Sequence, residues 1–120
     1  MGKALIVKPY WVDFLLKGEK TLEIRGSHTQ IRGTIGVVKS GTGLIYGTVE
    51  VVESVALDDK TYEERRSEHR VPAPFEDIPY RQVCGWKVQN PILFQTPRPY
   101  HHKQGCVIWV NVPDELIKPE

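Results

Sequence analysis

The stretch Gly18-Glu-Lys-Thr-Leu-Glu-Ile-Arg25 places a cation, a hydroxyl, a carboxylate and a guanidinium at one predicted junction between a helix and a strand. Apolar and polar residues alternate with a period of two from Lys20 to Arg25, which predicts a strand with two different faces. Leu22 and Ile24 form the apolar face, and Thr21, Glu23 and Arg25 form the charged one. We expect the apolar face in the core, which leaves the charged face for solvent or for a cleft.

The residues before this stretch predict a strand and then a helix. Ala4 to Val7 is an apolar, β-prone run, and Pro9 suits the first turn of a helix. Apolar residues then recur at helical spacing, and Gly18 follows as a left-handed cap, so the helix is about two to three turns long. The recurring residues are Val12, Leu15 and Leu16.

The residues after it predict two strands joined by a glycine-rich turn. Residues 34–39 and 44–57 are rich in β-branched side chains, and Ser40-Gly-Thr-Gly43 between them is a turn cluster. Gly47 interrupts the longer strand and marks a bulge. Residues 61–69 predict a helix that is solvent-exposed and structural, because Glu and Arg alternate along it.

The last third of the chain predicts two further strands, at residues 82–88 and 106–112, separated by a long Pro-rich and His-rich loop from 90 to 105. Residues 113–120 are expected to be a frayed tail of a single domain that spans residues 1–120. The sum is about six strands with two or more helices. This favours the α+β class and a small mixed β-barrel that the helices partly close.

The composition shows that the overall charge of the chain does not attract polyanions. Lys and Arg number 16 against 15 Asp and Glu, so the formal net charge is only +1. Any binding to nucleic acid must therefore come from a local patch. Only four uncharged residues separate Lys3 from Lys8, which is too short for a signal peptide or a membrane span, and we expect a cytoplasmic protein with no membrane partner.

The cysteines and histidines do not predict a metal site. Cys84 and Cys106 lie inside strand-like stretches and lack the spacing of a zinc knuckle or a redox pair, so we expect buried thiols. His101 and His102 are adjacent and point to opposite sides of an extended chain. We expect neither a metal nor another cofactor.

Five segments, in their order along the chain, resemble the ASCH family, which is related to PUA domains. They are Lys8-Pro-Tyr-Trp11, the Gly-x-Lys-Thr-x-Glu-x-Arg signature at residues 18–25, Arg32-Gly33, Gly47-Thr-Val-Glu-Val-Val-Glu53 and Gly85-Trp-Lys-Val-Gln-Asn-Pro91. The resemblance implies a PUA-like β-barrel with a cleft beside the signature, and a role in handling RNA or modified nucleosides. It also implies that Lys20, Glu23 and Arg25, with Ser40 after the next strand, face that cleft.

Chemistry gives these residues plausible ligand contacts. Lys20 and Arg25 can hold a phosphate or a base carbonyl, and Glu23 can accept a hydrogen bond from an exocyclic amine. Ser40 and the glycine-rich backbone beside it can bind an anion, although a plain turn is the alternative. The further predicted ligand contacts are Lys8, Tyr10, Trp86, Arg98, Tyr100, His101 and Lys103. Two alternatives stay open here, namely a core position for the rings of Tyr10 and Trp86 and a merely solvated loop for residues 96–103.

We therefore predict a module that binds RNA or a modified nucleotide, and keep a small hydrolase that acts on RNA or on N4-acylated cytidine as the alternative. In the hydrolase, Lys20 with Thr21 or Glu23 would be catalytic, or His101 or His102 would act as the base of a ribonuclease. The sequence departs from the related deacylases, which carry Thr where this chain has Glu23. An adaptor for other proteins lacks support because no long exposed apolar patch is visible, and the oligomeric state is not predicted.

Overall fold

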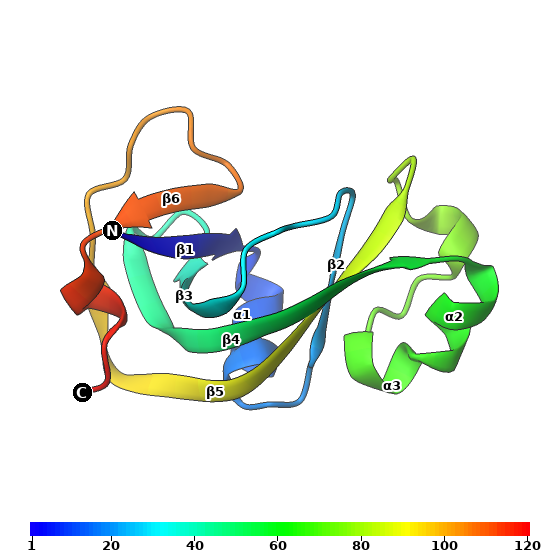
Figure 1. Ribbon diagram of the computed structural model, residues 1–120, viewed down its shortest axis with the longest axis horizontal. Helices are drawn as coiled ribbons and strands as arrows, with labels where there is room; N and C mark the ends of the chain where they lie inside the picture. Colours follow the sequence, from blue (N-terminus) through cyan, green and yellow to red (C-terminus); the bar gives the residue numbers. More distant parts are fainter.

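One six-stranded sheet organises the protein, as the computed structural model of residues 1–120 shows (Figure 1). The strands are β1 (Gly2–Val7), β2 (Leu22–Arg25), β3 (Gly33–Lys39), β4 (Leu44–Leu57), β5 (Val83–Pro99) and β6 (Trp109–Val112). Their order across the sheet is β2-β5-β4-β3-β1-β6. Every neighbouring pair is antiparallel except β1 and β3, which are parallel. The small six-stranded α+β fold predicted from the sequence is confirmed, and its barrel is an open one, because the edge strands β2 and β6 do not pair.

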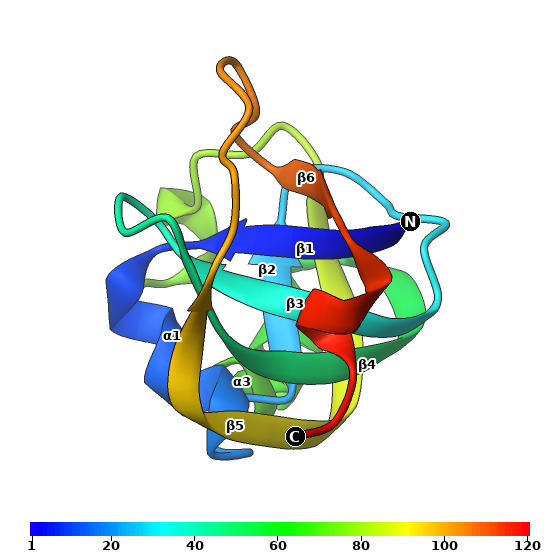
Figure 2. The same ribbon diagram turned by 90° about the vertical axis from the view of Figure 1, so that its left-hand side faces the viewer.

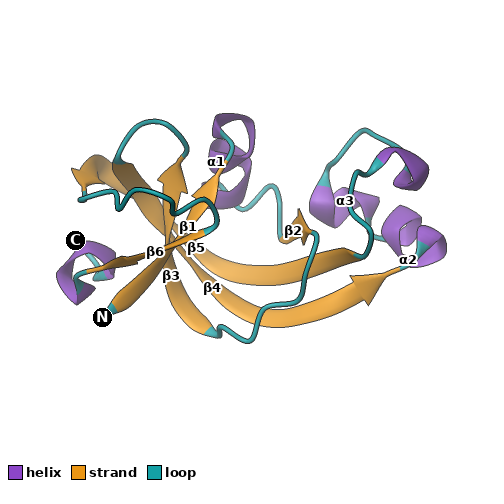
Figure 3. Cartoon of the chain, turned by 90° about the horizontal axis from the view of Figure 1, so that it is seen from above, coloured by secondary structure: helices purple, strands orange, loops and turns teal.

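The helices lie in separate places around the sheet (Figure 3). Helix α1 (Pro9–Leu16) connects β1 to the signature stretch, and Gly18 follows it with a φ of 77°, as a left-handed cap requires. Helices α2 (Asp59–Glu64) and α3 (Arg66–His69) and the 3₁₀ helix η1 (Phe75–Asp77) form a separate lobe at one end, between β4 and β5. A second 3₁₀ helix, η2 (Asp114–Ile117), follows β6. None of the helices has the length and hydrophobicity that a membrane span needs.

The single exposed helix predicted after β4 is wrong in two respects. The chain forms two short helices that break at Arg65, and their inner side is buried, with Tyr62 and His69 fully enclosed. A capping box starts α2, because the Asp58 carboxylate accepts from the Thr61 amide at 2.8 Å and the Thr61 hydroxyl accepts from the Asp58 amide at 2.9 Å. The neighbours of Tyr62 in the sequence are mostly charged, so the sequence pattern did not indicate that its ring is buried.

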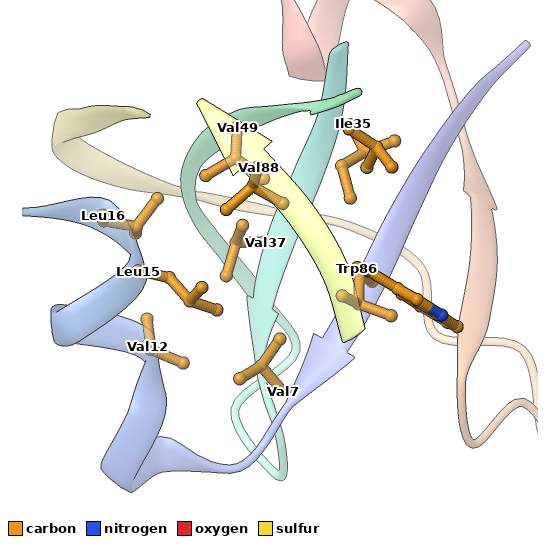
Figure 4. Packing of buried hydrophobic residues seen from close by; sticks show 11 residues of the cluster. Val7, Val12, Leu15, Leu16, Ile35, Val37, Val49, Trp86 and Val88 are labelled. Atoms are coloured by element: carbon orange, nitrogen blue, oxygen red, sulfur yellow. The ribbon is translucent and has the colours of Figure 1, made fainter. Parts of the chain in front are cut away.

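The main core lies between α1 and the concave face of the sheet (Figure 4). Figure 4 shows Val12, Leu15 and Leu16 pointing from α1 toward the sheet, with Val37 and Val88 opposite them. Each such side chain stabilises the fold by roughly 1.5–3 kcal/mol through the apolar surface it removes from water. This packing fixes the end of α1, and so fixes where the signature stretch begins.

A β-bulge at Tyr46 and Gly47 curves β4, as the glycine predicted. The register with β3 shifts between Val37 and Val38, and the register with β5 shifts between Ile45 and Gly47. A Cβ atom at Gly47 would lie 2.1 Å from the Ile92 carbonyl oxygen, so the close approach of the two strands admits only glycine.

The loop predicted for residues 90–105 is wrong in its first half, because β5 continues as far as Pro99. Beyond Val88, whose amide donates to the Thr21 carbonyl, β5 has a neighbouring strand only on the β4 side. Proline is tolerated in such an edge segment, because the missing amide costs no ladder hydrogen bond on the open side. The prolines of this segment are Pro91, Pro97 and Pro99. The last strand is also shorter than expected and begins at Trp109 instead of Cys106.

The C-terminal residues are held against the domain, which corrects the expected frayed tail. The Arg98 Nη1 atom donates hydrogen bonds to the carbonyls of Glu115, Leu116 and Lys118, the last at 2.7 Å. Leu116 and Ile117 pack on a second apolar cluster under β1 and β6. The segment after Pro113 is therefore part of the fold.

Candidate functional site

Three charged side chains of the signature meet at the end of α1 and along β2. Lys20 follows the helix cap, and Glu23 and Arg25 lie two residues apart on the same face of β2, as the alternation predicts. The Lys20 and Glu23 side chains are 1% and 7% exposed, and that of Arg25 is 16% exposed. Buried charges of this kind must be paired, which makes the cluster unlike the solvated strand edge that was the alternative.

Lys20 lies at the closed end of this cluster. Its Nζ atom donates a hydrogen bond to the His69 main-chain carbonyl, stands 4.2 Å from the centre of a Trp11 ring and is 3.8 Å from Glu23 Oε1. Burial lowers the pKa of Lys20 from 10.5 to about 8, although the Glu23 carboxylate acts to raise that pKa, and the Arg25 guanidinium adds to the lowering. The amine therefore loses its proton much nearer to neutral pH than an ordinary lysine does.

Glu23 and Arg25 form a two-point ion pair. Arg25 Nε and Nη2 donate to the same oxygen, Glu23 Oε2, at 3.0 and 2.8 Å, and Nη2 also donates to the Ile6 carbonyl at 3.0 Å. The pair leaves two polar atoms free, because Glu23 Oε1 accepts no hydrogen bond and Arg25 Nη1 donates none within the chain. No fully buried side-chain nitrogen or oxygen lacks a partner, so both free atoms reach the surface of the site.

The cluster forms the floor of a cleft of about 280 Å³. One aromatic wall is Trp11 of α1, and the other is Tyr80, whose ring packs so closely over Gly26 that a Cβ there would lie 2.8 Å from the ring. The lining residues are Ile6, Lys8, Trp11, Lys20, Glu23, Ile24, Arg25, Ser40, Val71, Tyr80 and Val107. The cleft thus combines an ionic floor with apolar and aromatic walls, as small-molecule sites generally do.

Five of the predicted site residues line this cleft together. They are Lys8, Lys20, Glu23, Arg25 and Ser40. Thr21 does not, because its hydroxyl lies near Lys87 Nζ at 3.3 Å and its amide donates to the Glu68 carbonyl. Tyr10 does not either, since its ring is 65% exposed on α1 and packs against Trp11 and Phe14.

Two further predicted contacts have structural roles. The Trp86 ring is buried, stacks on Trp109 with ring centres 5.7 Å apart and donates through Nε1 to the Ser27 carbonyl. The Arg98 guanidinium donates hydrogen bonds to the C-terminal carbonyls and lies 3.7 Å from the centre of the Phe94 ring. Neither side chain lines the cleft, although the Arg25 guanidinium carbon lies 5.5 Å from the centre of the Trp86 ring.

The remaining predicted contacts lie on the loop after β5. His101 and Lys103 border a shallow hollow beside Met1 and Pro113, away from the cleft. Tyr100 borders that hollow and also a cavity next to Ser40. The chain contains no group of three or more His, Cys, Asp or Glu side chains placed to hold a metal ion.

The sequence reasoning missed the contribution of the helical lobe. Val71 and Tyr80 line the cleft from that lobe, and the His69 carbonyl anchors Lys20. Only Tyr80 carried a signal, as an aromatic residue in an irregular segment after Pro79. Another hollow, of about 370 Å³, lies between β4 and η2, but its charged residues Glu50, Asp114 and Lys118 are on the surface, and it holds no buried ion cluster.

Comparison with known families agrees with the fold. A sequence model described as the ASCH domain matches residues 5–112, which is most of the chain. The protein belongs to the ASCH family. No curated protein matches it by sequence.

Solved structures of ASCH proteins share this fold. The ASCH protein of Zymomonas mobilis superposes with a TM-score of 0.70 at 11% sequence identity, over 96% of this chain and 90% of that one. Two single-residue variants of the same protein give TM-scores of 0.69 and 0.68, at 13% and 12% identity, and each covers 96% of this chain and 92% and 90% of its own. At these identities the likeness establishes the ASCH fold and nothing finer.

Proposed function

We propose that this ASCH protein binds a nucleobase of RNA, or of a modified nucleotide, in the cleft above Lys20, Glu23 and Arg25. The observation that carries the proposal is the preorganised ion cluster, whose members are held by the fold before any ligand arrives. Preorganised polar groups lose little entropy on binding, which favours specific recognition. The ASCH membership supports the same direction, since resemblance to this family implies a role in handling RNA.

The free atoms of the cluster match the edge of a base. Glu23 Oε1 is an acceptor and Arg25 Nη1 is a donor, and they belong to two side chains joined by a short ion pair. A base edge that carries an N–H donor beside a ring or carbonyl acceptor is complementary to this pair. Trp11 and Tyr80 supply aromatic walls against which such a planar group can pack.

Charge supports a nucleotide in preference to an uncharged heterocycle. The floor carries two cations against one carboxylate, and Lys8 adds an exposed amine at the rim. The excess positive charge and Lys8 favour a phosphate attached to the bound base. Because the whole chain has a net charge of only +1, this local excess is where a polyanion is attracted.

The test is a calorimetric titration of the protein with cytidine, N4-acetylcytidine, uridine, adenosine, guanosine and a short single-stranded RNA. We expect binding of at least one nucleoside, an affinity for RNA that falls as salt rises, and at least a tenfold loss in Arg25→Ala. Lys8→Ala alters an exposed side chain and is expected to weaken the binding of RNA while leaving the binding of nucleosides unchanged. Glu63→Gln is the control, since Glu63 lies on α2 outside the cleft. Binding of all probes that is equal in wild type and Arg25→Ala overturns the proposal.

One observation favours hydrolysis as a second candidate. A buried amine with a pKa near 8 beside a carboxylate is a typical arrangement for a catalytic lysine, and Lys20 and Glu23 provide it. Thr21 cannot assist, because it points away from the cleft, and neither His101 nor His102 lines it. Incubation with N4-acetylcytidine and RNA, monitored by mass spectrometry, tests this candidate. Turnover that disappears in Lys20→Arg supports it, and the absence of any product excludes it for these substrates.

A further inference from the structure

A second cavity adjoins the cleft and is not explained by the binding of one base. It measures about 370 Å³ and shares three lining residues with the cleft, namely Ile6, Ser40 and Val107. Ser40 and Val107 are exposed, so the two compartments open onto one continuous surface. The other lining residues are Val38, Gly41, Gly43, Tyr100, His102 and Cys106.

Two segments build this second compartment. One is the turn between β3 and β4, and the other is the loop that climbs from the end of β5 toward β6 (Figure 2). The Tyr100 amide donates to the Gly43 carbonyl at 3.2 Å, and the Ile6 amide donates to the Ile108 carbonyl at 2.8 Å. These bonds hold both ends of the loop against the turn and against β1, so the compartment is a fixed part of the fold.

The second compartment offers its own hydrogen-bonding groups. The Gly41 and Gly43 amides donate no hydrogen bond within the chain, and both residues line the compartment. The Tyr100 hydroxyl lies 2.7 Å from His102 Nδ1, and the two rings meet edge to face with centres 5.8 Å apart. Two unused backbone donors suit an anion, and a tyrosine with a histidine suits a flat polar ring.

We propose that the second compartment holds the nucleotide adjacent to the one in the cleft, so that the ligand is a single-stranded RNA segment of at least two nucleotides. This inference rests on the proposed function. The linking phosphodiester lies over Ser40, between the Lys8 amine and the free amides of Gly41 and Gly43. The second base lies against Tyr100 and His102.

The sizes of the two compartments agree with this ligand. Sites for small molecules usually enclose about 300–1,000 Å³, and the cleft, at about 280 Å³, is at the lower limit for a single base with its sugar. A free nucleoside would occupy the cleft and leave the adjoining compartment to water. A dinucleotide fills both, and gains the stacking of a second base.

The experiment compares nucleosides with the matching dinucleoside monophosphates CpC, UpU, ApA and GpG in calorimetric titrations. We expect the best dinucleoside monophosphate to bind at least about tenfold more tightly than its nucleoside. His102→Ala is expected to weaken the dinucleotide by about three- to tenfold and to leave the nucleoside unchanged. His101→Ala is the matched control, because it removes the same side chain one position away and His101 does not line the compartment.

The outcomes separate this inference from the proposed function. Equal affinity for nucleoside and dinucleotide, with the nucleoside still sensitive to Arg25→Ala, overturns the second compartment and keeps the base site. Equal effects of His101→Ala and His102→Ala also overturn it. If neither ligand binds, the base site itself is refuted and the inference falls with it.

Discussion

The Nζ atom of Lys20 donates a hydrogen bond to the main-chain carbonyl of His69, which lies 49 residues further along the chain. His69 is itself fixed, because the Val71 amide donates to its Nδ1 at 3.0 Å, so Nε2 carries the proton and donates to the Tyr62 carbonyl, 2.9 Å away. Burial lowers the pKa of His69, which keeps this ring neutral. The helical lobe between β4 and β5 therefore completes a site whose other charges come from the signature.

Ligand binding through Lys20 should weaken as the pH rises through about 8. The Lys20 pKa is lowered from 10.5 to about 8, so the amine of the free protein loses its charge between pH 7 and pH 9. We expect RNA affinity to fall by roughly tenfold per pH unit above 8, as linkage requires of one essential proton. Calorimetric titrations at pH 7, 8 and 9 measure the effect.

Lys20→Arg provides the control for this pH dependence, because a guanidinium stays charged over the whole range. The stability of the folded wild-type protein should change with pH in the opposite direction to its RNA affinity. A lysine whose folded pKa is lowered leaves the unfolded chain with more bound protons between pH 8 and pH 10.5, so its contribution to stability rises across that interval. An RNA affinity that is constant from pH 7 to pH 9 in the wild type would exclude a role for the charged amine.

Glu23→Gln should destabilise the protein by about 3 kcal/mol, because it leaves two buried or half-buried cations without their carboxylate. Since Glu23 raises the pKa of Lys20, that pKa should fall below its present value of about 8. Urea denaturation and an NMR titration of the Lys20 amine measure the two effects. Glu63→Gln breaks an exposed pair with Arg66 instead, and is expected to cost less than about 1 kcal/mol. Equal costs would show that the Glu23 cluster is solvated.

The sequence predicted the signature strand well because its information is local. Alternation alone placed Glu23 and Arg25 on one face of β2 and left Leu22 for the core, and both results are observed. It could not predict that Lys20 is enclosed, since that depends on Trp11 and on a carbonyl contributed from a distant segment. Tertiary contacts of this kind have no periodicity to detect.

The C-terminal third was predicted poorly for a related reason. Proline normally argues against a strand, but the prolines at 91, 97 and 99 lie in a segment of β5 with only one hydrogen-bonded neighbour, and sequence does not reveal which strands form edges. The same error placed Arg98 in a loop, where its side chain was predicted to contact the ligand. In the fold its guanidinium is used internally.

Arg98→Ala should therefore reduce stability and leave RNA binding within about twofold of wild type. The change removes the hydrogen bonds to the carbonyls of the C-terminal segment and the packing on Phe94, with an expected loss of about 1–3 kcal/mol. Thermal denaturation and RNA titration are measured on the same preparation, with Arg81→Ala as a control that removes an exposed arginine. Loss of RNA affinity at unchanged stability would restore the predicted ligand contact.

Glu68 should make the attachment of the helical lobe sensitive to acid. Its carboxylate accepts from Arg65 Nε and Nη2 at 3.1 and 3.0 Å and from Lys87 Nζ at 2.8 Å, which ties α3 to β5. These hydrogen bonds, from Arg65 first and then from Lys87, lower the pKa of Glu68 from 4.5 to about 2. The stabilisation is therefore fully present above the ordinary carboxyl range and is lost as the pH falls from there toward 2.

Glu68→Gln removes this titration and should cost about 1 kcal/mol at pH 7, because the network is partly exposed. The difference in unfolding free energy between wild type and variant should shrink as the pH is lowered from 5 to 3, and urea denaturation at both values measures it. Glu64→Gln, which alters an exposed carboxylate on the same lobe that makes no ion pair, should show no such change. The carbonyl that holds Lys20 also belongs to α3, so we further expect Glu68→Gln to weaken ligand binding at pH 7. A variant that loses stability but binds the ligand normally would show that the lobe holds Lys20 without this network.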